Sequence, residues 1–366
     1  MDATNKKYLF SPLLDFILLG GGSLILFPLV MFALPAAHIH TYHLYPVFVS
    51  LSVYIGYVAN MPHLLYSYQL IYQDFLKKVS GGRDKQLQVP YVWAGIIVPM
   101  TLAILFSYCY IKHNFMLFGF MVNISLLISG WHYAKQGFGV LIVTSIYQKI
   151  FYAPVERLVL IWNANILWAY LWIMFNSGLR HQRSYATWYY TLGFPKEMQM
   201  IFFYLSCFGL LCSIFVLVKK YLRESIIPPI SGIAGYVTPL YFWLVLLRYM
   251  PSAKFIHPVV LLVPAMHAIQ YMAIVFKMKQ NEVKCNKMTT VSLAIFIGMG
   301  VILGVLSFVA IPRFLDKTFT AHGPLYESIF WVAIFAVFIN IHHFFIDNVI
   351  WRKENREVKD YLYNIH

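Results

Sequence analysis

The sequence predicts an all-α, polytopic integral membrane protein, a bundle of about ten transmembrane helices with both termini in the cytosol. Of its 366 residues 60% are hydrophobic and 18% aromatic, whereas only 11% are charged, far fewer than in soluble domains. Apolar runs longer than about 18 residues, the length of a membrane-spanning helix, recur along the whole chain. No change of composition marks a domain boundary, so residues 1–366 are expected to form a single transmembrane domain.

The apolar runs place the expected helices at 12–36, 44–72, 90–111, 115–147, 155–176, 200–221, 230–248, 257–277, 290–311 and 325–351. The first run follows Lys6 and Lys7 and so resembles a signal peptide. It is longer than a typical signal-peptide core and is followed by only a weak cleavage site, so we expect a retained helix. The connections "KKVSGGRDKQ", "KKYLRES" and "KMKQNEVKCNK" are short and polar, as expected for loops.

The basic residues predict the orientation of the helices. With the N-terminus in the cytosol, the cytosolic helix ends hold most of the 28 Lys and Arg residues, which is the positive-inside pattern. The net charge of +14 follows from these helix ends and does not indicate a nucleic-acid partner. The outer connection 177–199 is rich in Trp and Tyr and is expected to lie along the outer interface. The scattered cysteines Cys109, Cys207, Cys212 and Cys285 form no paired motif and are expected to be structural thiols.

Five of the 13 histidines lie inside predicted spans, namely His63, His132, His267, His342 and His343. Their helices all run from outside to inside. At a rise of ~1.5 Å per residue, the imidazoles lie roughly 13–22 Å from the cytosolic boundary. Four helices therefore bring a histidine to a similar depth, which a generic apolar span does not require.

Polar residues follow these histidines at spacings of three or four positions. They are Ser67 after His63, Gln136 after His132, Gln270 and Tyr271 after His267, and Asp347 after His343. Residues three or four apart share a helix face, so both can point into one bundle interior. Neutral imidazole is a common ligand of Fe, Zn and Cu, and bundle cores build metal sites from facing helices. We therefore predict a metal site with the ligands His63, His132, His267 and either His342 or His343, and with the catalytic candidates Asp347, Tyr271, Gln136 and Gln270.

Simpler interpretations apply to some of these residues. A single buried histidine can be a core residue that hydrogen-bonds a neighbouring helix. Asp347 could form an ion pair with Lys135, the only basic residue deep in a span, and such a pair need not exclude a metal. The outer histidines His38, His40 and His43, in "HIHTYH", are expected to belong to a solvated loop.

The segments "PHLLYS", "WHYAKQ", "MHAIQY" and "IHHFFIDNVIWR" resemble the four short histidine motifs of the bacterial membrane carotene dioxygenases of the Brp/Blh type. The fourth segment is the most similar, and its register implies that His342, five residues before Asp347, carries the ligand. The chain departs from the family at Ser67 and Gln136, which stand near the positions of family carboxylates, and the third segment matches only in its histidine. The HxxxH boxes of membrane desaturases are absent.

The resemblance implies a non-haem Fe(II) centre, or another divalent metal, that uses O2 on a lipophilic substrate in the bacterial inner membrane. The sequence therefore favours a metal-dependent membrane oxygenase, among membrane lipids, whose substrate enters from the bilayer. A transporter could instead use the His, Gln, Asp and Lys groups as an ion relay, but no inverted repeat is evident. A haem-binding electron carrier, with two axial histidines on facing helices, is a further alternative.

Overall fold

The structure is a computed structural model. It describes residues 7–26, 28, 50, 54–80, 85–178, 181–184, 187–243, 253–319 and 329–363, with only the backbone described at 181–184, 187–188 and 253–261. These residues are almost entirely helical. Six helices are long and apolar enough to cross a membrane, as an integral membrane protein requires: Lys85–Ile111, Phe115–Tyr147, Pro154–Phe175, Lys196–Glu224, Thr290–Thr318 and Phe330–Ile350.

The N-terminal part contains short helices separated by π-helical turns, and then one long helix. In order it has α1 (Pro12–Phe16), a π-helical turn (Ile17–Gly21), a second one (Gly56–Asn60), α4 (Met61–Tyr72), α5 (Phe75–Val79), a 3-10 turn (Lys85–Leu87), α6 (Gln88–Val92), a π-helical turn (Trp93–Ile97), α7 (Val98–Ile111) and α8 (Phe115–Tyr147).

The C-terminal part contains most of the long helices. It has α9 (Pro154–Phe175), β1 (His181–Ser184), β2 (Thr187–Tyr190), α10 (Lys196–Glu224), α11 (Ile230–Val237), a π-helical turn (Thr238–Phe242), α13 (Ala253–Lys284), α14 (Thr290–Val305), a π-helical turn (Leu306–Ala310), α15 (Ile311–Thr318), α16 (Phe330–Ile350), α17 (Arg356–Val358) and a π-helical turn (Lys359–Tyr363).

Local signals explain several helix ends. The Asn114 side chain accepts a hydrogen bond from the amide of Leu117 at 3.0 Å and caps the start of α8. Pro154 begins α9, and the Glu156 carboxylate accepts a hydrogen bond from the amide of Ala153 at 2.9 Å. Accordingly α8 has the predicted bounds, and α9 lies one residue before them at each end. The predicted spans 12–36, 44–72, 230–248 and 325–351 extend outside the described residues, and His38, His40 and His43 lie outside them.

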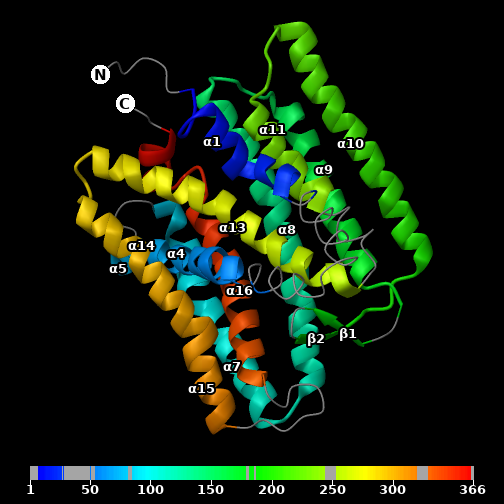
Figure 1. Cartoon of the computed structure of the whole chain (residues 1–366), viewed down its shortest axis with the longest axis vertical. Coiled ribbons are helices and arrows are strands. Elements are labelled where there is room, and N and C mark those ends of the chain that lie inside the picture. The colour runs from blue at the N-terminus through cyan, green and yellow to red at the C-terminus, as the bar shows by residue number, and fades with distance from the viewer. Residues whose placement is uncertain are drawn as a thin grey trace, which may run out of the picture.

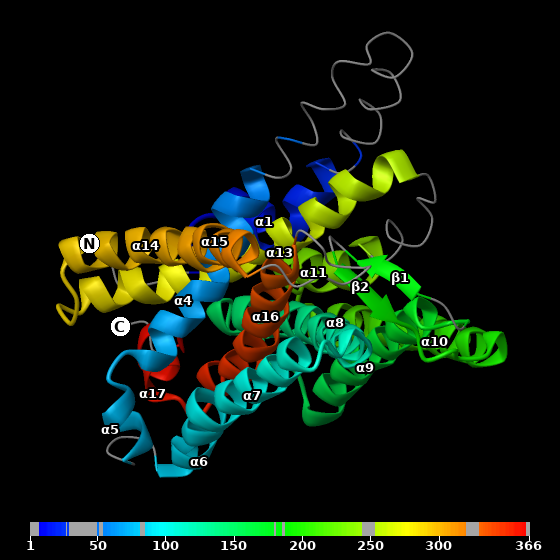
Figure 2. The same cartoon turned by 90° about the horizontal axis from the view of Figure 1, so that it is seen from below.

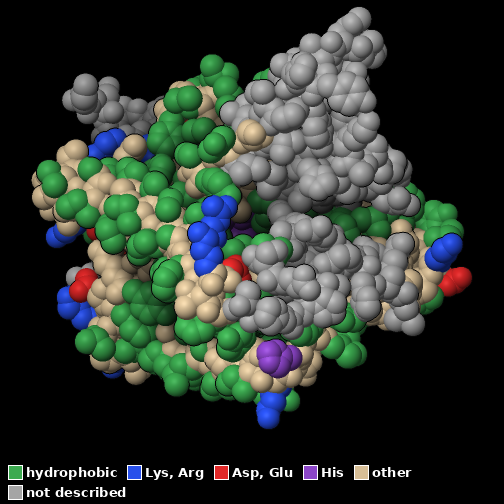
Figure 3. All heavy atoms as spheres, turned by 60° about the horizontal axis from the view of Figure 1, so that its bottom comes forward, with side chains coloured by type: hydrophobic (Ala, Val, Ile, Leu, Met, Phe, Trp, Pro, Cys, Tyr) green, Lys and Arg blue, Asp and Glu red, His purple; other side chains and the backbone are tan. Residues whose placement is uncertain are grey.

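The helices form a broad bundle around α8 (Figures 1 and 2). α9 and α10 lie along one edge, whereas α14 and α15 lie along the opposite edge, and α13 crosses obliquely between them. α16 packs against α4 and α8 in the middle of the molecule. Most of the described side chains on the face drawn in Figure 3 are hydrophobic, as expected of a surface that meets lipid.

The connection between α9 and α10 contains a feature that the sequence did not predict. β1 and β2 form an antiparallel pair in which His181 lies opposite Tyr190. Tyr and Trp have a high strand propensity, which accounts for a short hairpin in a segment expected only to lie along the interface.

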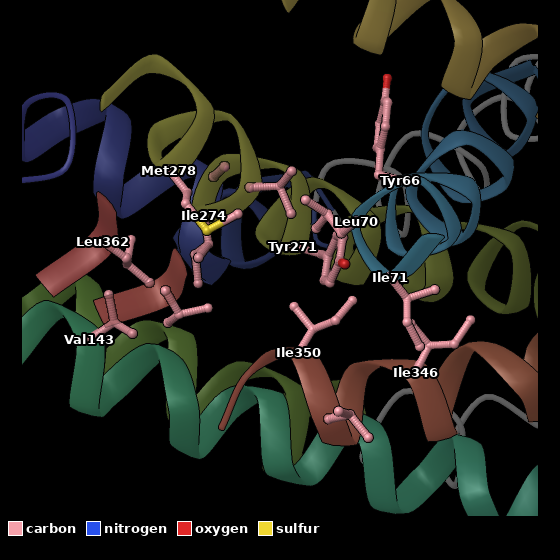
Figure 4. Close-up of a cluster of buried hydrophobic side chains, with 14 of the residues drawn as sticks. Tyr66, Leu70, Ile71, Val143, Tyr271, Ile274, Met278, Ile346, Ile350 and Leu362 are labelled. Carbon is pink, nitrogen blue, oxygen red and sulfur yellow. The ribbon is translucent and has the colours of Figure 1, made fainter. Parts of the chain in front are cut away.

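A large hydrophobic cluster joins segments that are far apart in the chain (Figure 4). It includes Leu9 and Leu362, so the segments next to the two termini pack at the same end of the molecule. Tyr271 projects from α13 into the space between α4 and α16 in the same cluster. The position of both termini in the cytosol stays a prediction.

The first helix is interrupted at Gly20, whose φ of 145° lies outside the range that L-residues adopt readily. A Cβ at this position would also lie 2.9 Å from the carbonyl oxygen of Ala234. The interruption frees the Leu19 carbonyl, which accepts a hydrogen bond from Nε2 of Gln270 at 2.5 Å. The Gln270 side chain of α13 therefore provides a hydrogen-bond donor for a backbone carbonyl of the first helix.

Candidate metal centre

Four buried histidines from four helices meet in the interior of the bundle. His63 of α4 lies with its ring centroid 5.4 Å from that of His267 of α13 and 5.1 Å from that of His343 of α16. His132 of α8 lies 4.9 Å from His267 and 5.1 Å from His343 by the same measure. Each ring therefore has two others as neighbours, and the four form a closed arrangement that we call the imidazole cluster.

The rings of the cluster stand edge to face. The interplanar angles of the four neighbouring pairs are 84°, 82°, 74° and 73°. In edge-to-face packing the edge of one ring meets the face of the next, so no two neighbouring cluster rings stack face to face. The similar depth that the sequence predicts for His63, His132 and His267 thus corresponds to direct side-chain contact.

Most ring nitrogens of the cluster have no hydrogen-bond partner in the described structure. Nδ1 of His63 donates to the carbonyl oxygen of Asn60 at 2.5 Å, which leaves the lone pair on Nε2, and this atom is buried and unpartnered. Nε2 of His132 and both nitrogens of His267 and of His343 are also buried without a partner. Buried polar groups in folded proteins are almost always hydrogen-bonded, so this concentration of free nitrogens requires an explanation.

Asp347 lies beside the cluster, one turn after His343 on α16. Its Oδ2 is 3.4 Å from Nε2 of His343 and 3.7 Å from Nε2 of His132, and it has no hydrogen-bond partner among the described residues. One donor atom from each of these three residues lies within 4.8 Å of the other two. Its Oδ1 accepts hydrogen bonds from Ser67 at 2.6 Å and from Tyr271 at 3.2 Å.

The alternative ion pair between Lys135 and Asp347 is not formed. Nζ of Lys135 donates to Oδ1 of Asn348 at 2.7 Å and lies 4.5 Å from the ring centroid of Trp131. Within the described parts of the chain, no Lys or Arg nitrogen lies within 4.0 Å of the Asp347 carboxylate. Lys135 is exposed, so it faces outward from the bundle instead of toward the cluster.

His342 lies outside the cluster, although the resemblance implies that it carries the ligand. Its Nε2 donates to the carbonyl oxygen of Ala94 at 2.8 Å, so its Nδ1 accepts from the Tyr68 hydroxyl at 2.7 Å. Both nitrogens are therefore engaged elsewhere. Consecutive helical residues point about 100° apart, so only one of His342 and His343 can face the other three histidines, and that residue is His343.

Gln136 and Gln270 lie behind His267 rather than at the rings. Nε2 of Gln136 donates to Oε1 of Gln270 at 2.8 Å and to the carbonyl oxygen of His267 at 3.1 Å. Nε2 of Gln270 donates in turn to the carbonyl oxygens of Leu19 and Gly235, at 2.5 Å and 3.1 Å. These contacts join α8 and α13 to the first helix and to α11, which fixes the backbone that carries His267.

Aromatic side chains close the cluster on two sides. The ring of Tyr133 stacks on His267 with a centroid distance of 4.0 Å, and Phe344 lies 4.7 Å from His132. The sequence does not single out Phe344 or the carbonyl of Asn60, because neither an aromatic residue in an apolar helix nor a backbone group gives a distinctive signal. The four cysteines are free, and none belongs to the candidate metal group.

The chemistry of this set fits a divalent transition-metal ion. Four imidazoles and one carboxylate oxygen are ligands that such ions accept, and most of their donor atoms are otherwise unpartnered. A positive charge nearby would also stabilise a buried carboxylate that has no basic partner, and an ion would supply that charge.

Comparison of the chain with protein-family models, with curated proteins and with solved structures finds no match. The functional conclusion therefore depends on the geometry of the imidazole cluster.

Proposed function

We propose that the protein is a membrane-embedded, metal-dependent oxidoreductase whose imidazole cluster and Asp347 hold one divalent metal ion. The observation that supports this most directly is the set of buried, unpartnered donor atoms on five neighbouring side chains. Three of them, His132, His343 and Asp347, place one donor atom each within 4.8 Å of the other two, and His63 and His267 adjoin these three through ring contacts. His63, His132, His267 and His343 are the proposed ligands. Asp347 is either a further ligand or the acceptor of a ring N–H that fixes a ligand's orientation.

Iron(II) is the metal we propose first. Imidazole nitrogen combined with carboxylate oxygen suits non-haem Fe(II), although Zn and other divalent ions accept the same donors. The histidine motifs that resemble those of the membrane carotene dioxygenases support the same choice. When bound, iron would supply the reaction with O2, and the cluster residues would hold it in a site from which water is largely excluded.

A lipophilic substrate is consistent with the surroundings of the site. The cluster is buried in a bundle whose helices expose large apolar side chains such as those along α10 and α14, and Phe344 and Tyr133 pack on its rings. A lipid-soluble molecule could reach such a site from the bilayer without crossing water. The ten-span topology, the cytosolic termini and the bacterial inner membrane belong to this proposal as well.

Metal content is the first test, and α16 offers a matched pair of variants. Wild type, His343→Ala and His342→Ala are purified in detergent and measured by elemental mass spectrometry together with an absorption spectrum. We expect about one iron per chain in wild type and in His342→Ala, and none in His343→Ala. Of these two adjacent histidines, His343 has ring nitrogens without hydrogen-bond partners, whereas both ring nitrogens of His342 are hydrogen-bonded. The two substitutions remove the same buried side chain at adjacent positions, so a general loss of structure would affect both.

Each other outcome points to a different conclusion. Wild-type protein without stoichiometric metal would overturn the proposal. Iron accompanied by a Soret band would indicate a haem carrier instead. Loss of metal from His342→Ala but not from His343→Ala would place the site on the face toward Tyr68, as the register of the resemblance implies. If iron is present without haem, oxygen uptake with lipophilic compounds tests the reaction itself.

A further inference from the structure

Two buried hydroxyl groups approach Oδ1 of Asp347. Oγ of Ser67, on α4, lies 2.6 Å from Oδ1 of Asp347 and 2.5 Å from the hydroxyl oxygen of Tyr271, on α13. The Tyr271 hydroxyl is also 3.2 Å from the same carboxylate oxygen. Both residues are almost completely buried, at 0% and 3% exposure, so water does not compete for these hydrogen bonds.

The two oxygens of the Asp347 carboxylate therefore have different surroundings. Oδ1 receives the hydroxyl groups, whereas Oδ2 has no hydrogen-bond partner in the described structure and faces Nε2 of His343 and of His132. A free aspartate side chain can rotate and exchange its two oxygens. Here the hydroxyls anchor one oxygen, and the other is left in the direction of the cluster.

The anchoring groups are themselves held by packing. The Tyr271 ring lies edge to face against His63, His343 and Trp351, with centroid distances of 5.5, 5.9 and 5.6 Å. Its hydroxyl therefore cannot swing away from Asp347 without displacing two cluster rings. Ser67 shares α4 with His63 at a spacing of four residues, so the same helix that supplies a ligand supplies the anchor.

We propose that Ser67 and Tyr271 are positioning residues that hold Oδ1 of Asp347 so that Oδ2 is presented to the metal ion in the imidazole cluster. The inference rests on the proposed metal site and adds two residues that need not touch the ion. Groups that orient ligands in this way influence metal affinity through the ligand that they hold.

The test is a titration of metal-free, detergent-purified full-length protein with Co2+, whose visible absorption reports both affinity and coordination. Tyr271→Phe and Ser67→Ala each remove one hydroxyl. We expect both variants to bind Co2+ about 10- to 100-fold more weakly than wild type, with an altered visible spectrum. Tyr66→Phe is the matched control, because Tyr66 is a buried tyrosine of α4 whose hydroxyl donates to the carbonyl of Ile297 at 3.2 Å, away from the cluster.

A double-substitution cycle separates positioning from a general structural effect. If Tyr271 acts through Asp347, Tyr271→Phe should cause no further loss of Co2+ affinity in an Asp347→Ala background. Equal losses in both backgrounds would overturn the positioning role. So would Tyr271→Phe and Ser67→Ala proteins that bind Co2+ as tightly as Tyr66→Phe, and in that case the metal site would stand. Wild-type protein that binds no Co2+ would overturn both the positioning role and the metal site.

Discussion

A carboxylate buried in a membrane protein is unfavourable unless a positive charge or several hydrogen bonds compensate for it. Asp347 has two hydroxyl donors at Oδ1, and its Oδ2 lies 3.7 Å from Nε2 of His132 and 3.4 Å from Nε2 of His343. Asp15 is the other buried aspartate among the described residues and lies in α1. By contrast with Asp347, both of its carboxylate oxygens accept hydrogen bonds, from the backbone amides of Leu9 and Phe10. The unpartnered oxygen of Asp347 is consistent with the cation that we propose at the cluster.

Replacing Asp347 by asparagine removes the charge and keeps the shape. We expect Asp347→Asn to weaken metal binding by about 10- to 100-fold, because the histidines remain but the anionic oxygen is lost. The measurement is metal affinity of the purified variant, with Asp15→Asn as the control that should bind like wild type. Unchanged metal affinity together with loss of ion flux in vesicles would instead favour a proton relay.

At the scale of single residues, the sequence could predict that His63, His132, His267 and Asp347 lie together in the bundle interior. Polar residues in apolar helices are easily recognised, and their depth follows from their distance to the helix end. It could not decide between His342 and His343. α16 is apolar around most of its circumference, so hydropathy does not reveal which face meets the bundle interior. The deciding partners of His342, Tyr68 and Ala94, are 274 and 248 residues away in the chain.

At the scale of helices, small residues allow neighbouring helices to cross closely. Gly300 of α14 packs directly on the ring of Tyr66, and a Cβ added there would collide with that ring. Tyr66 cannot easily move, because it stacks on Phe296 with a centroid distance of 5.1 Å and donates a hydrogen bond to Ile297. The crossing thus holds α4, which carries His63, against α14.

Gly300→Ala should therefore destabilise the protein by about 1–3 kcal/mol, since one added methyl group overpacks a rigid contact. Gly298→Ala is the control, because nothing lies within 4 Å of a Cβ at that position. We expect that variant to have unchanged or slightly higher stability, as alanine favours a helix over glycine by up to about 1 kcal/mol. Thermal denaturation in detergent measures both, and equal melting temperatures would contradict the packing argument.

The helices themselves were predictable where the sequence carries end signals or long apolar runs, as α8 and α9 show with Asn114 and Pro154. The π-helical turns were not, because the apolar pattern continues unchanged through segments such as Gly56–Asn60. The β1–β2 hairpin was missed because strands of four residues have too little pattern to identify in an aromatic-rich connection.

At the scale of the whole molecule, the cluster joins helices that are distant in the sequence, from His63 to His343. These ligands come together only in the folded chain. The free energy of metal binding therefore adds to the free energy of unfolding. Metal at about 100 times its dissociation constant should raise the free energy of unfolding by about 2.7 kcal/mol.

Removal of metal with a chelator should correspondingly lower the melting temperature of the wild type. The His343→Ala protein should melt at the same temperature with and without the chelator, whereas His342→Ala should respond as the wild type does. Differential scanning calorimetry on these three proteins checks the expectation. A chelator effect that persists in His343→Ala would show that the stabilising ion binds elsewhere.

The break at Gly20 bears on the order in which the protein is made. A backbone carbonyl exposed to lipid is strongly unfavourable, and the carbonyl of Leu19 accepts a hydrogen bond from Gln270, 251 residues later. While the ribosome is still synthesising the middle of the chain, the first helix therefore lacks this donor at its break. We expect this helix to stay near the translocon or the membrane surface, and to take its final depth only after α13 has been inserted.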